Sequence, residues 1–142
     1  MADAQVLAKI PQVYFDAWNG RDNHALDGFY ADRFTWTDPL LPGPLDSLEG
    51  AQGFLSGGWA GFSDLRFELI GGPLVDEANG RVAQTWRMLG THDGEFPPGA
   101  PPTGKPVDII GTDVWTVNDA GQVTELRACY DALTVMRQLG LA

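Results

Sequence analysis

Apolar residues recur at helical spacing near the N-terminus. The first run consists of Val6, Ile10, Val13, Tyr14, Ala17 and Trp18. Asn19-Gly20 supplies a C-terminal stop for this helix. Pro11 lies inside the run, where it either kinks the helix or begins its main part. Asp22 can cap a second helix over residues 22–30, and the apolar face of that helix would hold Leu26, Phe29 and Tyr30.

The next segments are shorter or more weakly patterned. Residues 33–39 alternate like a short strand that Pro39 closes, and the following residues 40–50 are typical of a loop. Residues 51–62 place apolar residues at helical spacing but are rich in glycine. A helix here would therefore depend on tertiary packing rather than on intrinsic propensity.

Farther along the chain, the apolar residues alternate as they do in strands. Four strands are predicted, over residues 65–70, 81–92, 107–117 and 122–131. Asn79-Gly80 favours a tight turn between the first two. The proline-rich residues 93–106 cannot pair in a sheet interior, so we expect a long, stiff loop there. A last short helix is expected over residues 132–140, ending at a glycine.

Helices followed by a run of long strands indicate an α+β fold with segregated layers. We predict a single domain over residues 1–142, because this length and a hydrophobic content of 44% suffice for one sizeable core. A mainly antiparallel sheet of such strands must twist and curl. The N-terminal helices would pack on its concave side and enclose a cone-shaped pocket.

Composition narrows the classes of partner. The formal net charge of −10 argues against a nucleic acid or an anionic membrane surface, because both require a cationic face. The single cysteine, Cys129, excludes an internal disulfide and fits a reducing compartment. No segment approaches the ~20 apolar residues that span a bilayer. We therefore expect a soluble, cytoplasmic protein whose ligand is a small molecule.

Alternation along the predicted strands places two acidic residues beside tryptophans. Asp38 shares a strand face with Trp36, and Asp113 shares one with Trp115. Charges on a solvent-facing strand normally accompany polar residues, so this mixture predicts an apolar pocket that contains carboxyls. Desolvation there would raise a carboxyl pKa and suit the group to proton transfer near neutral pH. Periodicity alone does not determine which face of each strand looks inward.

Asp131 lies where the last predicted strand meets the last predicted helix. Asp is a preferred N-cap residue, and a helix follows immediately. One carboxylate oxygen can accept a backbone hydrogen bond while the other faces a cavity, so a cap and a pocket role are compatible. On the strand itself, the residues of one face are Arg127, Cys129 and Asp131, opposite Leu126, Ala128 and Tyr130.

Large side chains on several elements are candidates for lining the pocket and binding a substrate. These are Trp18, Trp36, Trp59, Trp86, Met88, His92 and Trp115. Tyr14 lies on the apolar face of the first helix, where it serves either the core or the pocket. Two histidines and one cysteine, widely spaced, give no metal-ligand signature, and no phosphate-binding glycine loop precedes a helix. We therefore expect neither a metal nor a cofactor.

Several motifs, most of them in the second half of the chain, resemble those of the SnoaL-like polyketide cyclases, a family within the NTF2-like superfamily of cone-shaped α+β folds. They are G-T-H-x-G-E-F from Gly90, P-P-T-G-K from Pro101, G-x-D ending at Asp113, and Tyr130-Asp131 followed by Q-L-G. Residues 15–39 are similar to the usual opening of the superfamily. The resemblance covers nearly the whole chain and implies this fold.

The resemblance also implies a chemistry. SnoaL-type cyclases close a ring of aromatic polyketides by an intramolecular aldol reaction without metal or cofactor, and their acid/base aspartate corresponds to Asp131. In ketosteroid isomerase, a second relative, a tyrosine and a protonated aspartic acid hold the enolate oxygen beside an aspartate base. These three fall on Tyr14, Asp113 and Asp38. We therefore expect an acid/base enzyme, as a homodimer, acting on a small, apolar, cyclic carbonyl compound, with a non-catalytic binding protein as the alternative.

Overall fold

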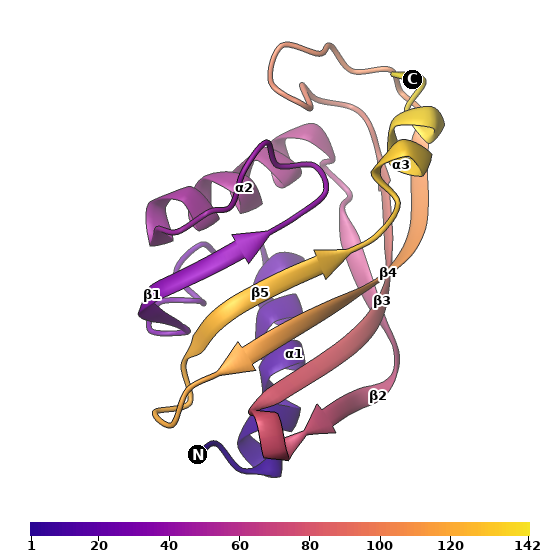
Figure 1. The fold of residues 1–142 in the computed structure, drawn as a ribbon. Coiled ribbons are helices and arrows are strands. Elements are labelled where there is room, and N and C mark those ends of the chain that lie inside the picture. Colours follow the sequence, from indigo (N-terminus) through magenta and orange to yellow (C-terminus); the bar gives the residue numbers. More distant parts are fainter.

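The computed structural model describes residues 1–142, in which helices cover one side of a curved five-stranded sheet (Figure 1). The elements in chain order are α1 (Ala4–Gly20), β1 (Tyr30–Thr37), α2 (Leu48–Gly61), β2 (Arg66–Asp76), the 3₁₀ turn η1 (Glu77–Asn79), β3 (Arg81–Thr91), β4 (Pro106–Val117), β5 (Val123–Cys129) and α3 (Ala132–Gln138). The predicted α+β fold with helices on the concave side of the sheet is confirmed.

Helix α1 carries the largest apolar surface of the helical layer. It begins where the Asp3 carboxylate accepts a hydrogen bond from the Val6 amide at 2.9 Å, and it runs through Pro11 without a break. Its buried face consists of Leu7, Ile10, Pro11, Tyr14, Phe15, Ala17 and Trp18. This face packs on β2 and β3, which brings the aromatic residues of α1 over the middle of the sheet.

The helix expected over residues 22–30 is wrong, because consecutive turns occupy this segment. The Asp22 carboxylate accepts a hydrogen bond at 2.9 Å from the backbone two residues on, which makes a local turn instead of a helix cap. Gly28 adopts a φ of 78°, which a right-handed helix does not tolerate. Leu26 and Phe29 are nevertheless buried, so their inward direction was right although their conformation was not.

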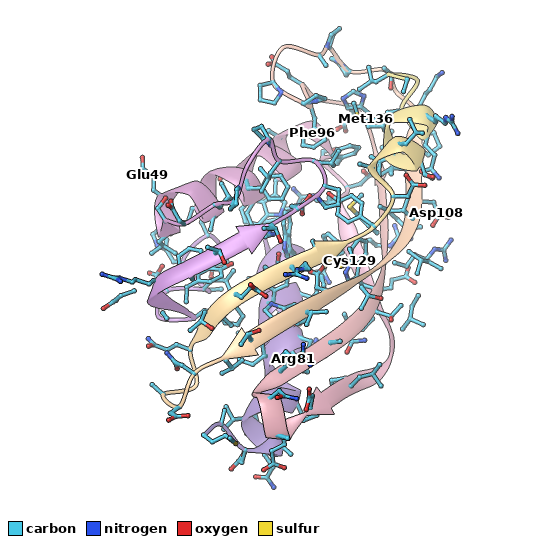
Figure 2. The ribbon with its side chains drawn as sticks, viewed as in Figure 1. Glu49, Arg81, Phe96, Asp108, Cys129 and Met136 are labelled. Atoms are coloured by element: carbon cyan, nitrogen blue, oxygen red, sulfur yellow. The ribbon has the colours of Figure 1, made fainter.

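Helix α2 forms despite its glycines. Ser47 caps it by accepting a hydrogen bond at 3.0 Å from the backbone three residues on. A Cβ at Gly58 would lie 3.0 Å from the Trp18 ring, and one at Gly61 would lie 2.5 Å from Phe96. These two glycines therefore allow α2 to lie close against α1 and against the β3–β4 loop, whose Phe96 is visible beside the end of α2 in Figure 2.

The five strands lie in the order β1-β5-β4-β3-β2. Strand β1 runs parallel to β5, and every other neighbouring pair is antiparallel. The β2–β3 connection passes through η1 and closes at Gly80 with a φ of 62°, at the position where a tight turn was expected. Residues 92–105 form the loop between β3 and β4, one residue earlier at each end than expected, because Pro106 already pairs with Thr91.

Burial identifies the inner face of the sheet, which the sequence pattern left open. Asp113 and Trp115 of β4 face the helices and are buried. On β5 the buried residue is Leu126, while its neighbour Arg127 is exposed. Cys129 is also exposed, on the outer side of the sheet (Figure 2). The inner face of β5 therefore consists of the residues that alternate with Arg127 and Cys129.

Candidate functional site

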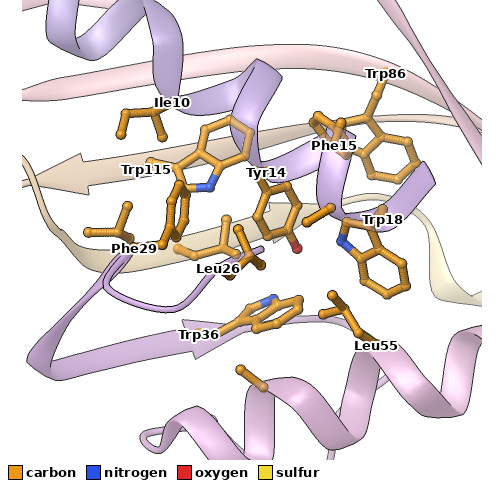
Figure 3. Close-up of a cluster of buried hydrophobic side chains, with 14 of the residues drawn as sticks. Ile10, Tyr14, Phe15, Trp18, Leu26, Phe29, Trp36, Leu55, Trp86 and Trp115 are labelled. Atoms are coloured by element: carbon orange, nitrogen blue, oxygen red, sulfur yellow. The ribbon is translucent and has the colours of Figure 1, made fainter. Parts of the chain in front are cut away.

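A cavity with an enclosed volume of about 60 Å³ lies between α1, α2 and the inner face of the sheet. Of the eighteen residues that line it, fifteen are hydrophobic and one is Gly58. The other two are Asp38 and Asp113, so the only charged side chains in the lining are carboxyls. Figure 3 shows aromatic side chains from α1 and from the strands gathered here. An apolar lining with two carboxyls suits a small, largely apolar organic molecule.

Asp113 lies in the middle of β4, and only 3% of it is exposed. The indole N–H of Trp86, on the neighbouring strand, donates a hydrogen bond to its Oδ1 at 3.0 Å. A Cβ at Gly111 would lie 2.5 Å from the Trp86 ring, so this glycine leaves room for the ring to cross β4. Burial raises the pKa of Asp113 well above its ordinary value, the Trp86 hydrogen bond opposes the rise, and the nearby Asp38 charge adds to it. Asp113 therefore favours its protonated, hydrogen-bond-donating form.

Asp38 lies just past the end of β1, and its carboxyl is better solvated by protein groups than that of Asp113. Its Oδ1 accepts hydrogen bonds from the Tyr130 hydroxyl and, at 3.0 Å, from the Leu40 amide. No protein group donates to its Oδ2, which stays free to accept a proton. Burial raises the pKa of Asp38, while the two hydrogen bonds favour the ionised form and lower it.

Tyr14 extends from α1 into the cavity, with 2% of the residue exposed. Burial, followed by the charge of Asp113, raises its pKa well above the ordinary value for tyrosine. The Trp18 indole opposes part of this rise. Because the hydroxyl keeps its proton, Tyr14 is able to donate a hydrogen bond and is not suited to act as a base. Tyr14, Asp38 and Asp113 are thus brought together on one cavity, as the resemblance implied.

Tyr130 is a functional candidate that the sequence reasoning missed. It lines the cavity and holds Asp38 through its hydroxyl. Burial and the charge of Asp38 raise the pKa of this hydroxyl, so it remains a donor. A signal was present, because Tyr130 alternates with Leu126 and Ala128, and the more apolar face of a strand normally looks inward.

The expectation that Asp131 faces the cavity is wrong. It caps α3, accepting hydrogen bonds from the Thr134 amide at 3.2 Å and from the Thr134 hydroxyl at 3.0 Å. These hydrogen bonds lower the pKa of its exposed carboxyl. The physical reason is the alternation of β5, since Ala128 and Tyr130 point inward and the intervening Cys129 and Asp131 point outward. The capping role that the sequence left open is the one that the structure contains.

The other predicted lining residues divide into two groups. Those on the cavity are Trp18, Trp36, Trp86 and Met88. Trp59 lies outside it and donates its indole hydrogen bond, at 3.0 Å, to a backbone carbonyl of α1. His92 is buried at the start of the β3–β4 loop, where its Nδ1 accepts a hydrogen bond from the Thr103 amide at 3.2 Å. Trp115 packs beneath Tyr14, with the two ring centres 5.3 Å apart.

No group of three or more His, Cys, Asp and Glu side chains is arranged to hold a metal ion. None of the helices is both long enough and apolar enough to span a membrane.

Known proteins share both the sequence pattern and the fold. A model of the SnoaL-like polyketide cyclases matches residues 8–139. A candidate SnoaL-like polyketide cyclase from Jannaschia sp. CCS1 is 24% identical, with a TM-score of 0.81, over 100% of this chain and 99% of that chain. IdmH, a candidate polyketide cyclase from Streptomyces antibioticus, is 27% identical, with a TM-score of 0.72, over 92% of this chain and 96% of its own.

A protein of ketosteroid isomerase-like fold from Catenulispora acidiphila, in complex with trimethylamine, is 16% identical, with a TM-score of 0.76. That alignment covers 94% of this chain and 93% of the other. No curated protein matches the sequence. The structural likeness confirms the predicted NTF2-like fold.

Proposed function

Because the chain belongs to the SnoaL-like polyketide cyclase family, we propose that it is a cofactor-independent acid/base enzyme. Its substrate would be a small, apolar, ring-forming carbonyl compound that it cyclises by an intramolecular aldol reaction through an enolate. The observation that carries this proposal is the pair of carboxyls, Asp38 and Asp113, in an otherwise apolar cavity. Burial raises the pKa of Asp38 and raises that of Asp113 much further, so the two carboxyls can provide a base and an acid in one site.

Asp38 is the proposed base. Its two hydrogen bonds favour the ionised form, while its burial makes the carboxylate more basic than one in water. Asp113 is the proposed acid, because it is more deeply buried and the charge on Asp38 disfavours a second negative charge beside it. Tyr14, which reaches the cavity from α1, supplies a second donor.

The reaction would proceed in two steps. Asp38 removes a proton from the carbon next to the substrate carbonyl, and the electron pair moves onto the carbonyl oxygen. Protonated Asp113 and Tyr14 donate hydrogen bonds to this oxygen, which lowers the cost of the developing charge. The enolate carbon then attacks a second carbonyl of the same molecule, whose oxygen receives the proton held by Asp38.

An isomerase is a second candidate, because Tyr14, Asp38 and Asp113, which correspond by resemblance to the donor, base and acid of ketosteroid isomerase, all line the cavity. It would share the first step, after which Asp38 returns the proton to a different carbon of the enolate. Conversion of 3-cyclohexen-1-one into its conjugated isomer, followed by ultraviolet absorbance, distinguishes this activity. Turnover of this ketone would favour the isomerase over the cyclase.

The shared step can be tested without knowing the natural substrate. The protein is incubated in D₂O with 2-tetralone, and loss of the proton signals next to the carbonyl is followed by NMR. We expect Asp38→Asn to slow the protein-dependent exchange by about 10²–10⁴-fold, the usual contribution of a general base. Asp131→Asn makes the same chemical change on the outer face and is the matched control. Equal exchange by wild type and Asp38→Asn would refute the proposal and favour a non-catalytic binding protein.

We further propose that the protein is a homodimer formed through the outer face of the sheet. The support is apolar surface on the two strands that flank β3, since Ile70 of β2 is 42% exposed and Ile110 of β4 is 62% exposed. Light scattering coupled to size-exclusion chromatography should give twice the chain mass, and Ile110→Glu should shift it toward the monomer. A monomeric wild type at all concentrations would contradict this proposal.

A further inference from the structure

Two hydrogen-bond donors on the cavity have no acceptor within the protein. They are the indole N–H groups of Trp18 and Trp36, both buried and both without a well-aligned partner. The residues are 6% and 1% exposed, and both line the cavity. By contrast, the Trp86 indole is bonded to Asp113 and the Trp59 indole to a backbone carbonyl.

The two indole groups approach the same part of the cavity. Figure 3 shows the nitrogens of Trp18 and Trp36 on the sides of their rings that face the Tyr14 hydroxyl. The ring centres of Trp18 and Trp36 lie 6.5 Å and 5.9 Å from that of Tyr14. The Trp18 N–H is near enough to the tyrosine oxygen to lower the pKa of Tyr14 in part, although its geometry falls short of a hydrogen bond.

An indole N–H can only donate, so these groups can be satisfied only by an acceptor. A buried donor without an acceptor is unfavourable, and native proteins keep few of them. The cavity lining offers the hydroxyl oxygens of Tyr14 and Tyr130 and the carboxyls of Asp38 and Asp113 as acceptors, but neither indole N–H makes a hydrogen bond with any of them. An oxygen atom of a bound ligand is the partner that this arrangement suits.

We propose that Trp18 and Trp36 bind a second oxygen of the substrate, distinct from the oxygen held by Asp113 and Tyr14. This inference rests on the proposed function and names its substrate class, an apolar compound with two acceptor oxygens, such as a diketone. In the aldol step the second carbonyl is the electrophile. As the new C–C bond forms, the π electron pair of this carbonyl moves onto its oxygen, and the two N–H groups stabilise that charge until Asp38 returns the proton.

Trp115 provides a matched comparison within the same molecule. Its indole nitrogen is also buried and without a partner, but Trp115 does not line the cavity. Trp115→Phe therefore removes the same kind of group, and opens a similar void, away from the proposed oxygen site. Any general effect of losing a buried indole should appear in this variant as well.

The test uses the indole N–H signals of the five tryptophans in the ¹⁵N-labelled full chain. Three probes of one ring system are titrated, namely 2-acetyl-1-tetralone with two oxygens, 1-tetralone with one, and tetralin with none. With the diketone we expect the Trp18 and Trp36 indole protons to move downfield by more than that of Trp115. Tetralin should not produce these shifts, because it offers no acceptor.

Affinity provides the second measurement. Trp18→Phe and Trp36→Phe should each weaken binding of the diketone about fivefold to tenfold, as expected for loss of one hydrogen bond. Trp115→Phe should leave the affinity for the diketone unchanged. If a cavity variant does not fold, the shifts in the wild-type protein still decide the question, with signals assigned from the remaining variants.

The inference is overturned if the Trp18 and Trp36 protons respond no more than that of Trp115, or if their variants weaken all three probes equally. The test of the oxygen site can fail independently of the test of the proposed function. Asp38-dependent exchange without the indole shifts would overturn the oxygen site alone. Indole shifts without any exchange would support the oxygen site and overturn the proposed enzyme.

Discussion

Aspartates occupy two regions of this molecule and behave in opposite ways. In the cavity, Asp38 and Asp113 sit among apolar side chains, and burial raises both pKa values. On the outer side, Asp131 accepts two hydrogen bonds at the start of α3, and its pKa is lowered. Solvation, and not residue type, therefore separates a group suited to proton transfer from one suited to capping a helix.

The two cavity aspartates, Asp38 and Asp113, also differ from each other in hydrogen bonding and burial. Asp38 accepts hydrogen bonds from a hydroxyl and an amide, whereas Asp113 accepts a single one from Trp86 and is more deeply buried. A carboxyl with more donors is easier to ionise, so the first proton lost from the pair belongs mainly to Asp38.

The largest effect after loss of the base is expected from Asp113→Asn. Asparagine can still accept the hydrogen bond from Trp86, but it replaces an acidic donor with a weaker one. We expect the exchange of 2-tetralone to slow by about 10²–10³-fold, the usual effect of removing an oxyanion donor. The measurement is the same NMR exchange assay, with wild type and Asp131→Asn alongside. An unchanged rate would remove Asp113 from the mechanism and leave it as a buried structural group.

A smaller effect is expected from Tyr130→Phe, which removes a hydroxyl that donates to Asp38. Because that hydrogen bond favours the ionised carboxyl, its loss should raise the pKa of Asp38 further. The exchange rate, which rises with pH as Asp38 ionises, should then reach its midpoint at higher pH. The high-pH plateau should change little, since a more basic carboxylate remains available.

Tyr30→Phe is the control for this pH profile. The Tyr30 hydroxyl is also buried, but it has no hydrogen-bond partner and does not line the cavity. Its removal should leave the midpoint where it is in the wild type. Equal shifts in both variants would mean that Tyr130 acts through packing and not through Asp38.

Much of the contrast between the cavity aspartates and Asp131 could be predicted from the sequence, because alternation along a strand shows which residues share a face of the sheet. The pairing of an acid with a tryptophan on one face correctly placed Asp38 and Asp113 in an apolar pocket. The same alternation sorted β5 into two faces but did not give their direction, and the family resemblance favoured the wrong one for Asp131. The apolar character of Leu126 and Ala128 was the better guide.

Other features depend on contacts that no local pattern contains. The hydrogen bond from Trp86 to Asp113 requires the register of β3 against β4, together with the space that Gly111 leaves for the indole. The segment 22–30 has the apolar spacing of a helix, yet turns at Asp22 and Gly28 override it. Spacing therefore predicted which residues are buried more reliably than it predicted backbone conformation.

The two regions should also oppose each other in the pH dependence of stability. The pKa of Asp113 is higher in the folded state than in the unfolded chain, so stability falls as pH rises above about 4, where the unfolded chain ionises first. For Asp131 the folded pKa is lower, so its contribution is present above the unfolded pKa and lost as pH falls through the folded value. Urea unfolding across this range should show that Asp113→Asn lessens the fall at higher pH and that Asp131→Ala removes part of the rise. Curves parallel to wild type would contradict the assigned shifts.

The smallest effect is expected where the outer aspartate is changed alone. Asp131→Ala removes both hydrogen bonds to Thr134 and should lower Tm slightly at neutral pH, whereas Asp131→Asn keeps an N-cap acceptor and should stay near wild type. Neither variant should alter the exchange of 2-tetralone, because the side chain lies outside the cavity. If Asp131→Asn abolished exchange while Tm stayed unchanged, the acid/base role implied by the family resemblance would return to Asp131. The cavity pair would then serve only to bind the substrate.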